Sequence, residues 1–378
     1  MTLAESNKRL ALTLSEHKDR YDRAVSRQAS VFMGGTGLDT PLLLSAELTE
    51  SQKAAFPDFN TKEAHNDLDR MLASQARSAL TAMNAGMDAV PSVRANMGVG
   101  ITASFFGVKP RLFDDKMPWV TERVPKARLE RMTADDLAVT PEIIQAIEHM
   151  EYMADALDGS GVRVYPVDVQ GAFDTAHIAL GDQIFYEIYD DPDFLRHLLD
   201  LSCAAAERAF DECVKRIPGS EETICHYNQL AMPRKLGGMK ISEDTSTLLS
   251  QEQIDEFVAP YTRRLLSYSG GGYVHYCGRN DYLFRTVLAE PLAYGLNFGN
   301  PEKHNMEECV AALAAKGKVY YGASARNGGE SRADYYARTL AASLDNGRSR
   351  LLLCDSCAAD EVGAVRDEWE KAKARVFA

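Results

Sequence analysis

From Met87 onward the sequence alternates between short apolar runs and amphipathic helical patterns, and this alternation restricts the fold more than any other feature. Short runs rich in β-branched and aromatic residues predict buried strands. They fall at residues 89–93, 98–104, 162–168, 222–227, 238–242, 273–277, 292–298, 318–323 and 350–354. Strands separated by helices predict a parallel sheet, and about eight of them predict an α/β fold of the (β/α)8 TIM barrel type.

Helical patterns fill the intervals and also dominate the start of the chain. Residues 192–217 carry apolar side chains on one helical face, and Ser250 and Gln253 form a capping box that begins another helix. Residues 61–85 show apolar spacing of three and four, which is typical of a helix. We therefore predict an N-terminal helical extension, residues 1–85, packed on a barrel formed by residues 86–378.

Three metal-capable side chains follow predicted strands: His275, Cys277 and Cys354. Because side chains alternate along a strand, His275 and Cys277 are expected to point to the same face. Cys354 ends a later strand and is expected at the same rim, where the active residues of such barrels gather. One His and two Cys leave a tetrahedral zinc one ligand short, which is typical of a catalytic rather than a structural site.

The cysteines allow two other interpretations. Cys357 would complete a closed structural zinc site with the same three ligands, but a barrel with a large core seldom needs one. Cys225 and His226 also end a predicted strand, but alternation sends them to opposite faces, so the two residues are not expected to hold one ion together. We assign Cys225 to the core and His226 to the pocket.

Acidic residues at predicted strand ends are candidates for catalysis. Glu243 and Asp244 follow the strand at 238–242, so either carboxylate would serve as a replaceable fourth ligand or as a proton acceptor. A solvated acidic pair is the alternative. Asp168 and Gln170 end another strand, where we expect them to orient the substrate or to hydrogen-bond His275. For Asp168 the alternative is a helix N-cap or a loop contact.

The remaining pocket candidates are Arg94, Asn96 and His177, together with His226. Arg94 would pair with an anionic group of the substrate, because guanidinium matches oxyanions well. Surface ion pairing is the alternative for Arg94.

The balance of charges and the use of cysteine exclude several classes of protein. A formal charge of −13 argues against nucleic-acid and anionic-membrane partners, which need a basic surface. No apolar run approaches the length of a membrane helix, and the first thirty residues lack a hydrophobic signal core. Seven cysteines scattered through a long chain do not suit a disulfide framework. We therefore expect a cytoplasmic protein with reduced thiols.

Several stretches together resemble the uroporphyrinogen decarboxylase superfamily. They are residues 168–176 with Gly181 and Asp191-Pro192, residues 238–244, residues 249–261, His275-Tyr276-Cys277-Gly278, and residues 295–301. The decarboxylases of this superfamily carry an arginine-rich N-terminal loop that grips porphyrinogen carboxylates, and nothing in this chain matches it. The His-x-Cys pair with a distant second Cys is similar instead to the zinc-containing, corrinoid-dependent methyltransferases.

This resemblance implies a (β/α)8 barrel, a zinc ion held by His275, Cys277 and Cys354, and methyl exchange with a corrinoid protein that carries methylcobalamin or another corrinoid. The second reactant would be a small thiol or another small methyl donor or acceptor, and the sequence does not choose the direction of transfer. Two alternatives stay open: a tetrapyrrole decarboxylase that needs no metal, and a non-catalytic, zinc-stabilised barrel that binds a partner.

Overall fold

The structure is a computed structural model that describes residues 2–378. Its α-helices are α1 Leu3–Ser15, α2 Lys18–Gly34, α3 Glu50–Ala55, α4 Thr61–His65, α5 Leu68–Ala85, α6 Lys126–Leu129, α7 Pro141–Ala156, α8 Ala172–Leu180, α9 Ile184–Asp190, α10 Pro192–Val214, α11 Gln251–Phe257, α12 Ala259–Ser269, α13 Asp281–Ala289, α14 Met306–Ala314, α15 Arg332–Ala342 and α16 Val362–Val376. Its strands are β1 Leu42–Ala46, β2 Ser92–Val93, β3 Pro110–Arg111, β4 Trp119–Val120, β5 Arg163–Val164, β6 Thr223–His226, β7 Leu230–Pro233, β8 Met239–Ser242, β9 Gly272–Tyr276, β10 Ala293–Phe298, β11 Val319–Gly322, β12 Leu344–Asp345, β13 Arg348–Ser349 and β14 Leu351–Cys357.

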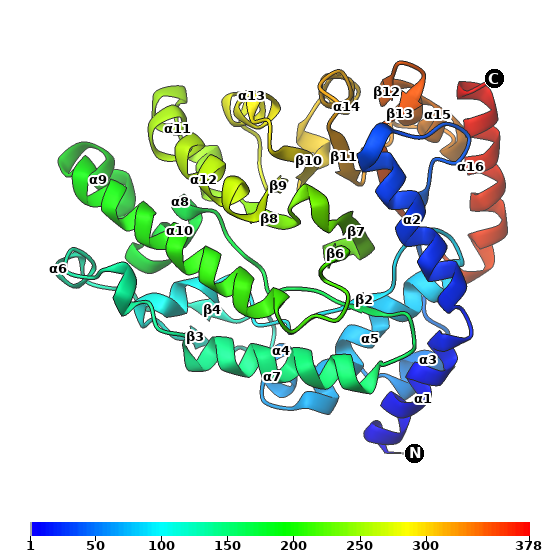
Figure 1. The fold of residues 1–378 in the computed structure, drawn as a ribbon. Coiled ribbons are helices and arrows are strands. Elements are labelled where there is room, and N and C mark those ends of the chain that lie inside the picture. The colour runs from blue at the N-terminus through cyan, green and yellow to red at the C-terminus, as the bar shows by residue number, and fades with distance from the viewer. Residues whose placement is uncertain (1) are drawn as a thin grey trace.

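A parallel sheet of six strands forms the centre of the molecule, in the order β1-β14-β11-β10-β9-β8. Helices α12, α13, α14 and α15 lie on its outer side (Figure 1). The strands are nearly all buried, as expected when helices cover a parallel sheet. This arrangement confirms the predicted α/β fold with parallel strands.

In the described part of the chain, the strands do not form the single closed barrel that the sequence predicts. β2 and β5 form a separate parallel pair. This pair is linked to the sheet at two points: a parallel bridge between Gln170 and Ser242, and a hydrogen bond from the Asp88 amide to the Leu42 carbonyl of 3.3 Å. Within residues 2–378 the strands therefore resemble a barrel but do not share one closed ladder of hydrogen bonds.

A β-hairpin occupies the inner side of the sheet. Residues 222–227 do form a strand, but β6 pairs antiparallel with β7 and lies outside the parallel sheet. Figure 1 shows the hairpin between β2 and the six-stranded sheet. Leu230 and Met232 of β7 belong to one buried apolar cluster with Tyr273, Tyr321 and Leu352 of the sheet. The hairpin thus fills part of the space that the predicted barrel would enclose.

Two further predictions need correction. Residues 98–104 are not a strand, because Gly98 takes a left-handed φ of 80° and residues 102–106 form a 3-10 helix. The predicted helical extension, residues 1–85, includes β1, which pairs with β14 in the central sheet. Helix α5 packs on β1 and α1 packs on α5, so this part of the chain contributes to the core. None of the helices in residues 2–378 combines the length and apolar character that crossing a membrane requires.

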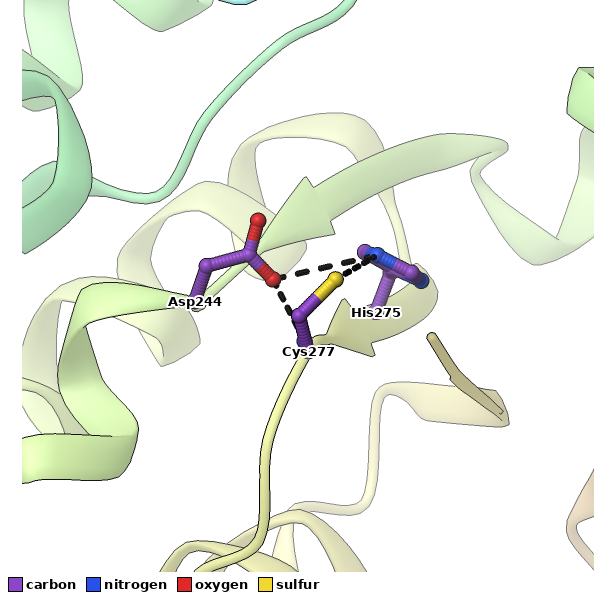
Figure 2. A group of neighbouring side chains, drawn as sticks. All are labelled: Asp244, His275 and Cys277. Carbon is purple, nitrogen blue, oxygen red and sulfur yellow. Dashed lines mark hydrogen bonds and ion pairs between the residues drawn. The ribbon is translucent and has the colours of Figure 1, made fainter. Parts of the chain in front are cut away.

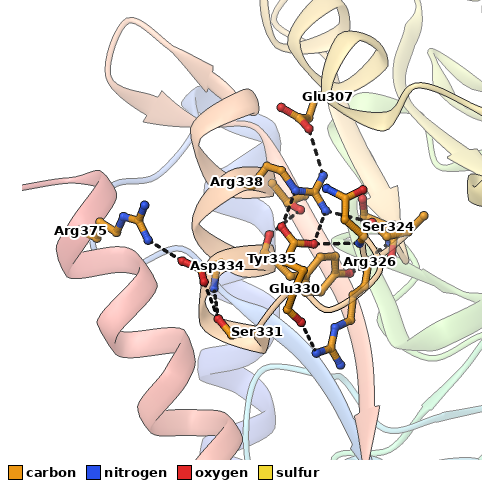
Figure 3. Close-up of polar contacts among 12 residues, drawn as sticks. Glu307, Ser324, Arg326, Glu330, Ser331, Asp334, Tyr335, Arg338 and Arg375 are labelled. Atoms are coloured by element: carbon orange, nitrogen blue, oxygen red, sulfur yellow. Dashed lines mark hydrogen bonds and ion pairs between the residues drawn. The ribbon is translucent and has the colours of Figure 1, made fainter.

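The loop between β11 and α15 is fixed by a polar network (Figure 3). Arg338 donates two hydrogen bonds of 2.7 Å to the Glu330 carboxylate and one of 3.0 Å to the Ala325 carbonyl. The Tyr335 hydroxyl donates to the Ser324 carbonyl at 3.0 Å. Paired contacts between arginine and a carboxylate define geometry well, so this loop is held firmly against α15.

Candidate metal centre

Asp244, His275 and Cys277 lie together at the C-terminal ends of β8 and β9 (Figure 2). The Cys277 Sγ atom is 3.6 Å from His275 Nε2, and Asp244 Oδ1 is 3.8 Å from the same nitrogen. One ligand atom from each residue lies within 4.8 Å of the other two. In residues 2–378 this is the one group of three or more such side chains close enough to hold a metal ion. We call these three residues the metal group.

The imidazole of His275 is oriented by its neighbour on β10. Asn297 Oδ1 lies 2.5 Å from His275 Nδ1, while Asn297 Nδ2 donates to the Tyr321 carbonyl at 2.6 Å. Because the amide nitrogen already donates to Tyr321, the oxygen must face the ring and accept a hydrogen bond from Nδ1–H. Nε2 is then left with its lone pair directed toward Cys277 and Asp244. Histidine ligands of metals are commonly held in this way by a second residue.

Burial controls the protonation of this group. It lowers the pKa of His275, so the imidazole is neutral at pH 7. Burial, followed by the charge of Asp244, raises the pKa of Cys277 to about 11. The thiol is therefore protonated unless a cation is nearby, and a bound metal ion would reverse this shift.

Cys354 lies at the same level of the sheet but does not join the metal group. His275 pairs with Asn297, and Tyr321 pairs with Leu352. The register of β10 with β11 brings Asn297 level with Tyr321, so Cys277 and Cys354 each lie two residues beyond one common level. Between them lie three strand spacings of about 4.8 Å each. Cys354 instead lines a cavity of about 310 Å³ with Gln229, and burial raises the pKa of its thiol to about 12.

β14 continues beyond Cys354 to Cys357, so Cys354 does not end its strand as the sequence predicts. Alternation then places the two thiols on opposite faces of β14. Cys354 packs against the apolar cluster that contains Tyr273, Tyr321 and Leu352, whereas Cys357 belongs to the larger hydrophobic core on the other face. This geometry argues against a closed site that uses both cysteines.

Of the two acidic candidates, Asp244 belongs to the metal group and Glu243 does not. The Glu243 carboxylate accepts hydrogen bonds of 2.7 Å from the hydroxyls of Ser246 and Thr262 on the outer side of β8, where burial raises its pKa to about 7. Asp244 Oδ1 accepts the Cys277 amide at 2.5 Å, which holds the end of β9 against it.

Asp174, on the first turn of α8, is a positioning residue that the sequence reasoning missed. Its carboxylate accepts the amides of Asp244 at 2.7 Å and of Thr245 at 2.8 Å. It therefore fixes the backbone that carries Asp244. Asp174 does lie in residues 168–176, one of the stretches that resemble the superfamily. The sequence alone, however, does not indicate which backbone amides will donate hydrogen bonds to a carboxylate on a helix.

Asp168, Arg94 and Lys240 form a second group, which we call the charged cluster. The Asp168 carboxylate pairs with the Lys240 ammonium and lies 3.5 Å from the Arg94 guanidinium. Burial alone would raise the pKa of Asp168, but the two cations outweigh it and hold the pKa well below its usual range. Lys240 pairs with Tyr273, which lies two residues before His275 on β9. The charged cluster therefore lies two residues closer to the N-terminal ends of the strands than the metal group, on the same face of the sheet.

The other predicted pocket residues are dispersed. His226 borders the charged cluster, and burial lowers its pKa to about 3. His177 contacts the Thr245 hydroxyl at 3.1 Å and Asp182 at 3.0 Å, beside the metal group rather than in it. Asn96 contacts the Met117 sulfur at 3.5 Å. Gln170 links the segment after β5 to β8 through its bridge to Ser242.

Comparison with known proteins bears on the fold. No protein-family model matches the chain, and no curated protein matches it by sequence. A solved structure described as a methyltransferase from Methanosarcina mazei is similar, with a TM-score of 0.57 and 13% sequence identity. The match covers 94% of this chain and 99% of that chain. At this identity the likeness concerns the fold alone.

Proposed function

We propose that this chain is a zinc-dependent methyltransferase that moves a methyl group between a corrinoid protein and a small thiol or methyl donor. The observation that carries the proposal is the pairing of His275 Nε2 with Cys277 Sγ at 3.6 Å, together with the Asn297 contact that leaves Nε2 free to bind a metal. The pair lies at the C-terminal edge of a parallel sheet, where barrel enzymes place their active residues. The fold shared with the Methanosarcina mazei protein is consistent with it.

The donor atoms suit zinc. A neutral imidazole and a thiolate are common zinc ligands, and either Asp244 or Cys354 would add one further negative charge. In both cases a zinc dication would reach a formal charge of zero, with one coordination position open to substrate. Zinc bound there would lower the pKa of a substrate thiol, so that a thiolate is present at neutral pH.

A carboxylate of the metal group would also deprotonate that substrate. Asp244 is 40% exposed, so with Cys354 as the third ligand the Asp244 carboxylate would accept the proton that an incoming thiol releases. When the thiol is the acceptor, its sulfur forms a bond to the methyl carbon while the cobalt–carbon bond breaks, and the electron pair of that bond stays on cobalt. When the corrinoid is the acceptor, the transfer runs in reverse.

Two residues, Asp244 and Cys354, are candidates for the third protein ligand of the zinc. Asp244 already lies beside His275, whereas Cys354 would have to cross part of the interior to reach it. The sequence resemblance favours Cys354, and the geometry favours Asp244. One experiment separates the two, because sulfur and oxygen ligands differ in zinc-edge X-ray absorption.

We would measure zinc content and zinc-edge absorption of the full chain and of four variants: Cys277→Ser, Cys354→Ser, Asp244→Asn and, as the control, Cys309→Ser on α14. We expect about one zinc per chain in the wild type and the control, and loss of zinc in Cys277→Ser. Loss of one sulfur ligand in Cys354→Ser would assign the third position to Cys354, whereas loss of one oxygen ligand in Asp244→Asn would assign it to Asp244.

Addition of 2-mercaptoethanol tests the open position. We expect the zinc of the wild type to gain one sulfur ligand. A chain without zinc would contradict the metal site. A chain whose zinc gains no sulfur would contradict methyl transfer to a thiol and would favour a non-catalytic, zinc-stabilised barrel.

A further inference from the structure

The charged cluster contains more positive than negative charge. Arg94 and Lys240 both face Asp168, and the three side chains are only about 15% exposed: 15% for each cation and 14% for the carboxylate. Among residues 2–378 no second carboxylate lies within 4.0 Å of either cation. A buried charge without a partner is costly, so this excess positive charge calls for an anion that the chain does not supply.

A small cavity opens directly onto these charges. It measures about 20 Å³ and is lined by Arg94, Tyr165, Asp168, His226, Tyr227 and Lys240, among others. This volume holds about one water-sized group. The guanidinium of Arg94 also lies 5.8 Å from the ring centre of Tyr165, so packing as well as charge holds it in place.

His226 provides an independent indication that something binds here. The imidazole is 5% exposed and packs edge-on against Tyr273, with 5.1 Å between ring centres. Its Nε2 atom is buried and has no hydrogen-bond partner. Buried polar atoms nearly always have a partner, so an unpaired nitrogen beside a cavity indicates a missing group.

We propose that the charged cluster is a binding site for a small oxyanion, such as a carboxylate, sulfonate or phosphate group. One oxygen of the anion pairs with Arg94 and Lys240 where the cavity opens, which leaves the water-sized interior for the group that contacts His226. A hydroxyl group of the ligand, or a water molecule bound with it, satisfies His226. The site rests on the charges of the cluster and needs no metal, so it stands whether or not the proposed function is correct.

The position of the site also restricts the substrate, in a statement that does rest on the proposed function. The charged cluster is two residues below His275 on the strands, which corresponds to a rise of about 6 to 7 Å. A substrate that reaches both the charged cluster and the metal group would carry its negative charge at that distance from the atom that exchanges the methyl group.

Calorimetric titration of the full chain with sodium acetate tests the site. The protein is first treated with a chelator, so that failure of the anion site is distinguished from failure of the metal site. We expect saturable binding in the millimolar range for the wild type. Arg94→Met and Lys240→Met should each weaken it at least tenfold, since each removes the excess positive charge. Circular dichroism establishes that each variant is folded.

Asp168→Asn provides the opposite test. It removes the carboxylate that competes with the ligand, so acetate should bind several-fold more tightly than to the wild type. Lys109→Met, at an exposed lysine outside the cluster, is the matched control and should bind as the wild type does. Absence of saturable binding in the wild type would overturn the proposal. So would equal affinity in Arg94→Met and Lys240→Met, or weaker binding in Asp168→Asn.

Discussion

Replacement of Asn297 by alanine tests whether the orientation of His275 prepares it to bind a metal. Asn297 joins two groups: its Oδ1 atom lies 2.5 Å from His275 Nδ1, and its Nδ2 atom donates to Tyr321 at 2.6 Å. Alanine removes both contacts, so the ring is free to rotate and Nε2 is no longer kept unprotonated. Loss of such a supporting contact weakens metal binding by about 10- to 100-fold, which corresponds to about 1.4 to 2.7 kcal/mol.

The measurement is a competition for zinc between the protein and a chromophoric chelator at neutral pH. Asn84→Ala is the control, because Asn84 also forms hydrogen bonds with two groups, Glu47 and Gln52, but it is half-buried and lies on α5. Asn297→Ala should lose about 1 to 3 kcal/mol of stability from buried groups left without partners, and Asn84→Ala should lose less because its contacts are more exposed. Equal zinc affinity in the two variants would refute the role that we assign to Asn297.

Two further predictions concern stability. Arg338→Lys should make the loop after β11 more sensitive to trypsin and lower the free energy of unfolding by about 1 to 2 kcal/mol, since lysine cannot form the paired contact with Glu330. Arg375→Lys is its control: the ion pair there is 66% and 58% exposed, so we expect a change below about 0.5 kcal/mol, and equal effects would contradict the argument. Burial lowers the pKa of His149, so the folded chain resists its protonation and loses stability as the pH falls below the pKa of the unfolded state. Denaturant unfolding at pH 7.5 and pH 5 should therefore show a smaller loss for His149→Gln than for the wild type, and an equal loss would disprove this assignment.

The strands on either side of the metal group were predictable because local and tertiary preferences agree there. Residues 273–277 and 292–298 are short runs in which apolar and aromatic residues predominate, and the structure forms β9 and β10 within one residue of those limits. The shared face of His275 and Cys277 follows from alternation alone. The role of Asn297 did not, because an asparagine inside a strand carries no signal of which side chain it will meet.

The errors arise where tertiary contacts decide the structure. Residues 222–227 have the apolar pattern of any buried strand, and only the turn at Gln229, with a left-handed φ of 65°, sends the chain back antiparallel. The level of Cys354 follows from strand order and register, which no local pattern contains. Whether it binds the metal stays a prediction.

The hairpin of β6 and β7 separates the residues that fill the interior from the strands that form the sheet. Barrels usually fill their centre with side chains from the strands themselves, so any enlargement of the chamber disturbs the wall. Here a separate piece of main chain supplies the filling, with Tyr227 bordering one cavity and Gln229 the other. Because β6 and β7 lie outside the parallel sheet, we expect a change in the length of that turn to alter both cavities without removing any pairing between the parallel strands.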